Sequence, residues 1–193
     1  TVLSALVDMA IPGNAIPRVF INTGIEYKAI VEFVHSQMQI DDRFIEIKPS
    51  MPLSMIFRKY GYPFKSKEHS QLVHLYQQNG HSKTTLRYYD PPQHRVRFGC
   101  PKILRYQFEE GTNFKISDKC CTKLKKEPFA EWQNENGKPY KMTGERLGEG
   151  GLRASHKGCL VIDKNSELKK FKPLNPMTDE WMEWFIKKHK IEL

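Results

Sequence analysis

The segment from Thr143 to Arg153, TGERLGEGGLR, combines residue types that bind anions. Its glycines let backbone N–H groups approach a ligand closely, and Arg146 and Arg153 can each bind phosphate or sulfate oxygens through paired hydrogen bonds. An anion site is therefore one interpretation of this pattern. The other is that the arginines pair with nearby carboxylates such as Glu145 or Glu149, as surface arginines often do.

A second candidate contact site is the tripeptide Asn22-Thr23-Gly24. It follows the apolar run RVFIN, residues 18–22, which predicts a buried parallel strand. In α/β proteins, ligands bind beyond the carboxyl ends of such strands. The same tripeptide after a strand is also typical of a plain turn, so taken alone it leaves both interpretations open.

The four cysteines are too few for a disulfide scaffold in a chain of 193 residues, and they lack the paired C-x2-C spacing of a structural zinc site. Cys120 and Cys121 are adjacent, and neighbouring cysteines rarely bridge each other because the geometry is strained. The pair is interpreted either as free thiols or as ligands of a metal or iron–sulfur cluster.

Charge and hydropathy narrow the class of protein. With 31 Lys and Arg against 22 Asp and Glu, the net charge is +9, which favours an anionic partner: nucleic acid or a small phosphate or sulfate ligand. No apolar run approaches the length that crosses a bilayer, and no signal peptide is evident, so we expect a cytoplasmic protein without a membrane partner. The composition excludes disorder, collagen and coiled coil.

The elements that must position these residues follow an α/β rhythm. Apolar spacing predicts a helix over residues 2–10, the strand at 18–22, a helix whose apolar face runs from Ile25 to Val34, and a strand at 44–47. This order predicts a mainly parallel sheet with right-handed crossovers.

Local patterns also predict the elements of the rest of the chain. We expect a helix capped by Ser66, with Leu72, Val73, Leu75 and Tyr76 facing inward, and a long loop or lid over residues 81–99. Further expectations are a helix from residue 118 towards 132, strands at 138–142, 159–162 and 168–171, and a last helix capped by Thr178.

Four segments together resemble the phosphoadenylylsulfate (PAPS) and adenylylsulfate reductase family. CCTKLKKEPF, residues 120–129, is similar to the family pattern CC-x-x-x-K-x-x-P-L, and the strand ending in Asn22-Thr23-Gly24 is similar to one that ends in DTG. The pattern around TG-x-R is matched by Tyr140, Thr143, Gly144, Arg146, Glu149 and Arg153, with Gly150 replacing a serine. The run from Lys170 to Ile191 resembles the family's K-x-x-P-L and I-x-x-H-x-I segment.

The resemblance implies a three-layer α/β fold of the adenine nucleotide alpha-hydrolase type, a mainly parallel twisted sheet flanked by helices. It implies one nucleotide-binding domain over residues 1–193, with a variable insertion around 80–115. The nucleotide- or sulfate-binding residues would be Asn22, Thr23, Gly24, Lys125, Thr143, Gly144, Arg146, Glu149 and Arg153.

The implied activity is that of an oxidoreductase of sulfur metabolism. A thiolate would attack the sulfur of an adenosine phosphosulfate, and a thioredoxin-like thiol donor would then release sulfite. Cys120 and Cys121 would be two ligands of a 4Fe-4S cluster. We expect that the chain lacks the family's S-G-G-K-D-S phosphate loop and its C-terminal C-x2-C and nucleophilic cysteine, so no catalytic residue is assigned.

Two other functions stay open. An ATP pyrophosphatase or sulfurtransferase of the same superfamily would bind ATP and act on a nucleic acid or another substrate. A non-catalytic nucleic-acid-binding module, which the motifs favour least, would use aromatic residues interleaved with cations, namely Arg87, Tyr88, Tyr89, Arg95 and Arg97.

Overall fold

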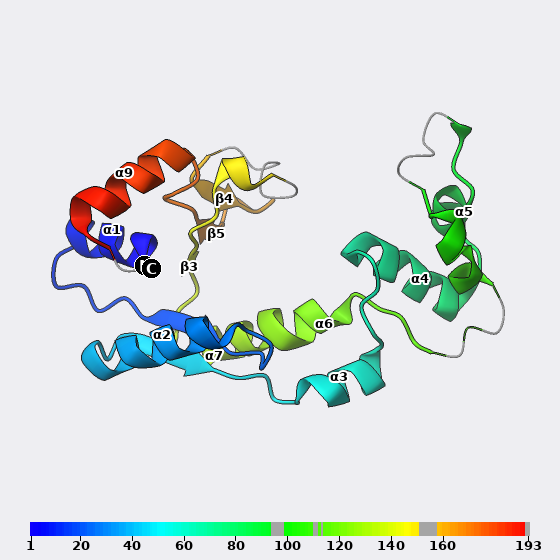
Figure 1. The fold of residues 1–193 in the computed structure, drawn as a ribbon, viewed down its shortest axis with the longest axis horizontal. Coiled ribbons are helices and arrows are strands. Elements are labelled where there is room, and N and C mark those ends of the chain that lie inside the picture. The colour runs from blue at the N-terminus through cyan, green and yellow to red at the C-terminus, as the bar shows by residue number, and fades with distance from the viewer. Residues whose placement is uncertain (94–98, 110–111, 113, 151–157, 192–193) are drawn as a thin grey trace. The chain divides into compact units, whose positions relative to one another are not determined.

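The computed structural model describes residues 1–93, 99–109, 112, 114–150 and 158–191. The chain forms two compact units (Figure 1): a terminal unit made of Thr1–Arg18, Asp41–Ile45 and Trp132–Leu193, and a middle unit made of Val19–Ile40 and Glu46–Glu131. With 51% helix and 11% strand, the structure agrees with the predicted α/β class. One three-layer sheet and a single domain over residues 1–193 stay predictions.

The first strand pair is the one that the sequence predicts. β1 (Arg18–Ile21) pairs with β2 (Phe44–Ile47). The N–H of Arg18 donates to the carbonyl of Arg43 at 2.7 Å, and that of Asn22 to the carbonyl of Ile47 at 2.9 Å. Because both bonds advance in the same direction, the two strands are parallel. α2 (Lys28–Ile40) is the crossover helix between them, and it begins later than its apolar pattern suggests.

In the terminal unit, α1 (Val2–Ala10) lies beside α9 (Asp179–His189), as Figure 1 shows. Val2, Leu174 and Phe185 form the buried centre of this pair. Thr178 caps α9 as predicted, because its side chain accepts a hydrogen bond from the N–H of Trp181. Leu174 and Met177 pack in this cluster, which ties the segment before α9 to the helix pair.

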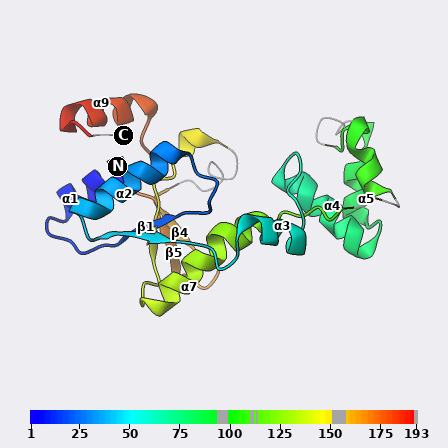
Figure 2. The ribbon, with the colours of Figure 1, turned by 60° about the horizontal axis from the view of Figure 1, so that its bottom comes forward.

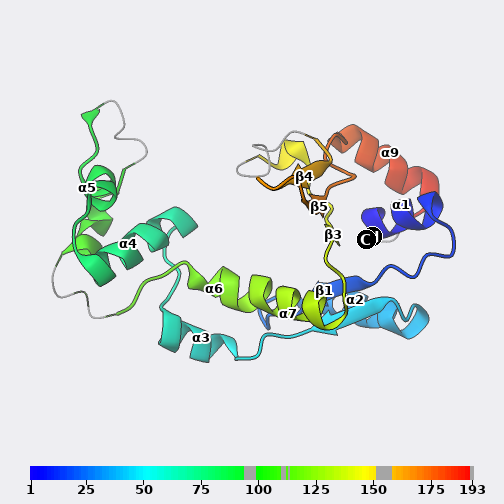
Figure 3. The ribbon, with the colours of Figure 1, turned by 180° about the vertical axis from the view of Figure 1, so that it is seen from behind.

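The same unit contains a small sheet (Figure 3) in the order β3 (Lys141–Met142), β5 (Leu168–Phe171), β4 (Leu160–Ile162). β3 is parallel to β5, and β4 is antiparallel to it. The predicted strand pair at 159–162 and 168–171 is confirmed, whereas the strand expected over 138–142 is only two residues long. A short 3-10 helix, η4 (Leu147–Glu149), follows β3.

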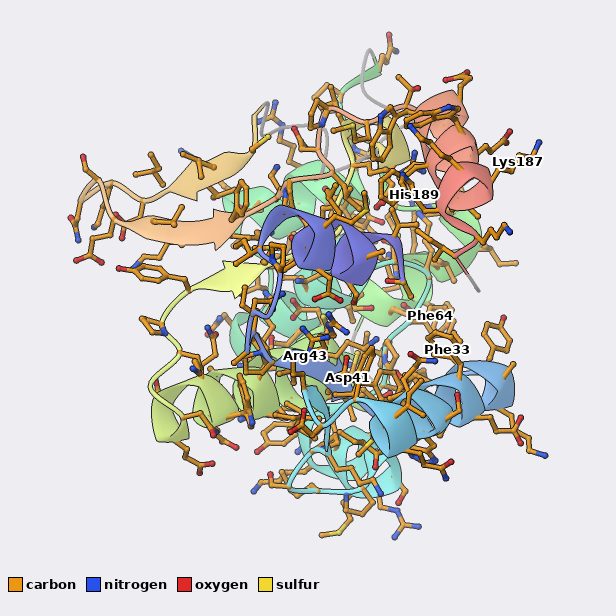
Figure 4. The ribbon with its side chains drawn as sticks, turned by 90° about the vertical axis from the view of Figure 1, so that its left-hand side faces the viewer. Phe33, Asp41, Arg43, Phe64, Lys187 and His189 are labelled. Carbon is orange, nitrogen blue, oxygen red and sulfur yellow. The ribbon has the colours of Figure 1, made fainter. Side chains whose placement is uncertain are left out.

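A four-residue ion network joins two segments of the terminal unit, Thr1–Arg18 and Asp41–Ile45. Arg43 Nη1 lies 2.7 Å from Asp8 Oδ1, and Arg43 Nε lies 2.9 Å from Asp41 Oδ1. Arg18 pairs with both Asp8 and Asp41. Figure 4 shows Asp41 and Arg43 close together. Each charge in the network therefore has at least two opposite neighbours, although residues 8 and 43 are distant in sequence.

The middle unit has its own helical core. It contains α3 (Leu53–Tyr60), α4 (Lys67–Asn79), α5 (Lys83–Tyr89) and the 3-10 helix η2 (Lys102–Phe108). α4 and α5 lie together in Figure 2. Side chains from these elements and from the segments beside them bury one cluster: Leu72, Val73, Tyr88, Cys100, Phe108 and Ile116.

Two expectations for this region are wrong. The segment predicted as a loop over residues 81–99 contains a helix, because Ser82 and Thr85 form a capping box that starts α5, and residues 94–98 of it lie outside the described part of the chain. Leu75 does not face inward, since 38% of it is exposed. The helix predicted from Ser66 to Gly80 is confirmed at both ends, with Ser66 accepting a hydrogen bond from the N–H of His69.

The helix that carries the cysteine pair is continuous but irregular. It runs through α6 (Lys119–Cys121), a π-helical segment η3 (Thr122–Lys126) and α7 (Glu127–Glu135). Pro128 lies inside it and has no N–H, and its ring would clash with the carbonyl of Leu124 in a regular α-helix. Widening to a π turn just before Pro128 relieves this conflict.

Within the part of the chain that the structure describes, no helix is both long and apolar enough to cross a membrane.

Candidate functional site

The turn after β1 is held by its own side chains. Asn22 Oδ1 accepts a hydrogen bond from the N–H of Gly24 at 3.0 Å, and Asn22 Nδ2 donates to Glu46 Oε1 at 2.6 Å. Gly24 has a φ of 85°, a backbone conformation that favours glycine. The predicted tripeptide is thus a fixed turn at the carboxyl end of a parallel strand.

The carboxylate of Glu26 holds this turn in place through hydrogen bonds. Its carboxylate accepts hydrogen bonds from the backbone N–H of Thr23 at 2.9 Å and from the Thr23 hydroxyl at 2.8 Å, and only 4% of Thr23 is exposed. Burial opposes ionisation of Glu26, but the hydrogen bonds from Thr23 and the charge of Lys125 outweigh it and lower the pKa of Glu26. Glu26 is therefore a carboxylate at neutral pH.

Lys125 reaches the same turn from η3. Its Nζ atom lies 3.6 Å from Glu26 Oε1, and 54% of its side chain is exposed. The structure thus brings together two predicted anion-binding features that are far apart in sequence. The ammonium group is anchored on one side by Glu26 and remains accessible to a ligand on the other.

Sequence reasoning missed Glu26 as a functional residue. The pattern Thr23-Gly24-Ile25-Glu26 is of the T-x-x-E type, in which a carboxylate commonly reaches back to a backbone N–H three residues earlier. That pattern could have identified Glu26 as the residue that holds the turn. Its contact with Lys125 has no such local signature.

The second predicted segment begins directly after β3, in the terminal unit. The N–H of Thr143 donates to the carbonyl of Phe171 at 2.9 Å, which continues the parallel pairing with β5. The Thr143 hydroxyl is buried and has no hydrogen-bond partner within the described part of the chain. Gly144 follows at the surface, beside Leu3 and Leu174.

Arg146 is engaged by carboxylates. Its Nη1 lies 2.5 Å from Oδ1 of Asp179, the first residue of α9, and its Nε lies 4.0 Å from Glu149. Glu145 instead pairs with Lys170 at 2.8 Å. An anion that binds Arg146 must therefore compete with Asp179. Pairing of the arginine with carboxylates, which the sequence left open as the alternative to an anion site, is observed for Arg146. One partner is Glu149, as the sequence suggested, and the other is Asp179, which it did not suggest. Arg153 lies outside the described residues.

The cysteine pair sits at the start of the irregular helix, and both thiols are half-buried and free. Burial is the main cause that raises the pKa of the Cys120 thiol. Among the described residues, no group of three or more His, Cys, Asp or Glu side chains could hold a metal ion. Cys120 and Cys121 supply two thiolates where a 4Fe-4S cluster uses four ligands, so we derive no chemistry through such a cluster.

The aromatic nucleic-acid surface suggested by Tyr88 is not supported. Only 8% of Tyr88 is exposed, and its hydroxyl lies 2.9 Å from Nδ1 of His69. His69 is also buried, and its Nε2 atom lies 2.7 Å from Oε1 of Gln107. Burial raises the pKa of Tyr88 to about 12. Tyr88 is thus a core residue that cannot stack on a base, and Arg95 and Arg97 lie outside the described residues.

Comparisons with known proteins add no relative: no protein-family model matches the chain, and no curated protein matches it.

Proposed function

We propose that this protein binds an adenosine phosphosulfate or a related adenine nucleotide, as a PAPS-reductase-like enzyme of sulfur metabolism. The observation that carries the proposal is the position of Lys125 beside the Thr23-Gly24 turn. Both features belong to motifs that resemble those of one family, and tertiary folding of the middle unit brings them together.

The chemistry of the site fits an anionic ligand. A phosphosulfate repels an attacking thiolate, and cations near the sulfate offset that repulsion. Lys125 is an accessible cation, and its Nζ atom lies 3.6 Å from Glu26 Oε1. In the terminal unit, Arg146 is a further cation that is able to donate to a phosphate or sulfate oxygen.

In the proposed reaction, a cysteine thiolate attacks the sulfur of the sulfate. The new S–S bond forms as the S–O bond to the phosphate breaks, and the adenosine phosphate leaves with the electron pair. A thiol donor then attacks the cysteine sulfur, forms a disulfide and releases sulfite. We assign no residue of this chain as the nucleophile, so the residues named above bind and neutralise the anion.

Calorimetric titration of the purified chain with PAPS, adenylylsulfate, ATP and AMP tests the proposal. The expected result is that a phosphosulfate binds more tightly than AMP by about tenfold or more, because the sulfate group gives the cations a second anionic group to contact. Preference for ATP would favour the pyrophosphatase alternative instead. Equal affinity for all four ligands, or no binding, would overturn the proposal.

A further inference from the structure

A cationic pocket lies in the middle unit, with a volume of about 730 Å³. Its walls come from the end of α3, from α4 and from the segment that leads into α6. Ligand pockets of a few hundred to about a thousand Å³ typically hold a molecule of the size of a nucleotide. None of the residues proposed above to bind the phosphosulfate lines this pocket.

Three lysines line the pocket: Lys59, Lys115 and Lys119. All three are exposed, and within the described part of the chain none of them forms an ion pair. Glu109 lines the pocket as the opposing charge. The lysines exceed it by two positive charges, so the described lining favours an anion with more than one negative charge.

Aromatic side chains line the same space. Tyr60, Tyr76 and Phe114 contribute to the walls, and 40% of Phe114 is exposed. The Nζ atoms of Lys59 and Lys123 lie 5.4 Å and 4.8 Å from the centre of the Tyr60 ring. Cations next to aromatic faces form the combination that binds a phosphate and a base in one ligand.

Hydrogen bonds hold part of the pocket lining in place. Gln77 of α4 donates through Nε2 to the carbonyl of Phe114 at 2.9 Å and accepts through Oε1 from the N–H of Ile116 at 3.0 Å. The N–H of Tyr62 donates to the carbonyl of Lys115 at 2.8 Å. These bonds hold Phe114 and Lys115 in place before any ligand arrives, which lowers the entropic cost of binding.

We propose that this pocket binds a nucleoside phosphate, with its phosphates on Lys59, Lys115 and Lys119 and its base against Phe114. The site is separate from the one that contains Lys125. It does not depend on the proposed reductase function.

The test uses a chain in which Lys125→Ala and Arg146→Ala remove the two described cations that are proposed above to bind the phosphosulfate. This chain is titrated calorimetrically with ADP and with inorganic pyrophosphate. Adding Lys59→Gln, Lys115→Gln and Lys119→Gln is expected to lower the affinity for both ligands by about tenfold or more. The matched control neutralises three exposed lysines elsewhere, Lys102, Lys126 and Lys138, and is expected to change affinity by less than about twofold.

Phe114→Ala tests the contact with the base independently of the contacts with the phosphates. It is expected to weaken the binding of ADP but not that of pyrophosphate. The proposal is overturned if ADP does not bind, if both lysine triples have the same effect, or if only a single-stranded oligonucleotide binds. Because the readout compares lysine variants in one background, failure here leaves the phosphosulfate proposal untouched. Thermal melting of each variant confirms that it is folded.

Discussion

Lys125 lies 3.6 Å from Glu26, and Glu26 in turn holds the backbone and hydroxyl of Thr23. One carboxylate therefore couples a lysine in the middle of an irregular helix to the turn at the end of a parallel strand. Ionised Glu26 is the centre of this arrangement, because both the turn and the cation depend on its negative charge.

Replacing Glu26 with Gln should loosen the turn. The amide keeps the shape but loses the charge-assisted bonds from Thr23, so we expect a loss of about 1–2 kcal/mol in the free energy of unfolding. Urea unfolding measures this. Glu32→Gln is the control, because its i,i+4 pair with Lys28 is exposed and should contribute under about 0.5 kcal/mol. Equal effects of the two substitutions would contradict the role given to Glu26.

The ion network around Asp8 should make stability fall in acid. Burial of Asp8 opposes ionisation, but the hydrogen bonds from Arg43, Asn14 and Arg18 outweigh it and lower its pKa from 3.8 to about 2. Because the folded state binds the proton more weakly, this stabilisation is complete above pH 3.8 and disappears as the pH falls through about 2.

Asp8→Asn should remove that part of the pH dependence. At neutral pH it should cost about 1 kcal/mol, since the carboxylate is partly exposed and water screens the pairs. Urea midpoints measured between pH 2 and 7 provide the comparison, with exposed Asp42→Asn as control. A parallel pH profile for Asp8→Asn and the unmodified chain would show that the network does not act as described.

Removing the hydroxyl of buried Tyr88 should destabilise the helical core of the middle unit. Tyr88→Phe leaves Nδ1 of His69 without its 2.9 Å partner, which we expect to cost about 1–3 kcal/mol. Tyr27→Phe is the control, because 83% of Tyr27 is exposed. If chemical denaturation finds both variants equally stable, the hydrogen bond contributes nothing to the fold.

Asp179 should act as a competitor of the ligand at Arg146. Asp179→Asn removes the carboxylate that now pairs with Arg146 at 2.5 Å, so adenylylsulfate affinity should rise by about two- to fivefold. Glu183→Gln, an exposed change on the same helix, should leave affinity unchanged. An unchanged or weaker affinity after Asp179→Asn would contradict the role given to Arg146.

Local sequence patterns predict the helices and strands that form because of neighbouring residues in the sequence. β2, α4 and α9 were predictable from an apolar run or from a capping residue with a glycine or acidic neighbours, and the structure confirms them. α5 was not, because its seven residues, KTTLRYY, show no apolar period. It is stable because Tyr88 is buried in one cluster with residues of α4 and η2, which is a tertiary effect, and Thr85 is buried as well.

The candidate site divides in the same way. The turn at Thr23 follows from a strand and a glycine, and is readable in the sequence. The link from Glu26 to Lys125 and the partner of Arg146 are not, because each joins residues that only folding brings together. No spacing rule in the sequence distinguishes Asp179 from other exposed carboxylates.

The most direct test of the account compares two neighbouring lysines. Lys125 contacts Glu26 beside the turn, whereas exposed Lys126 is the matched control. Calorimetric titration with adenylylsulfate should show that Lys125→Ala weakens binding by about tenfold or more, while Lys126→Ala changes it by less than about twofold. The same affinity for both variants would contradict the claim that Lys125 binds the anion.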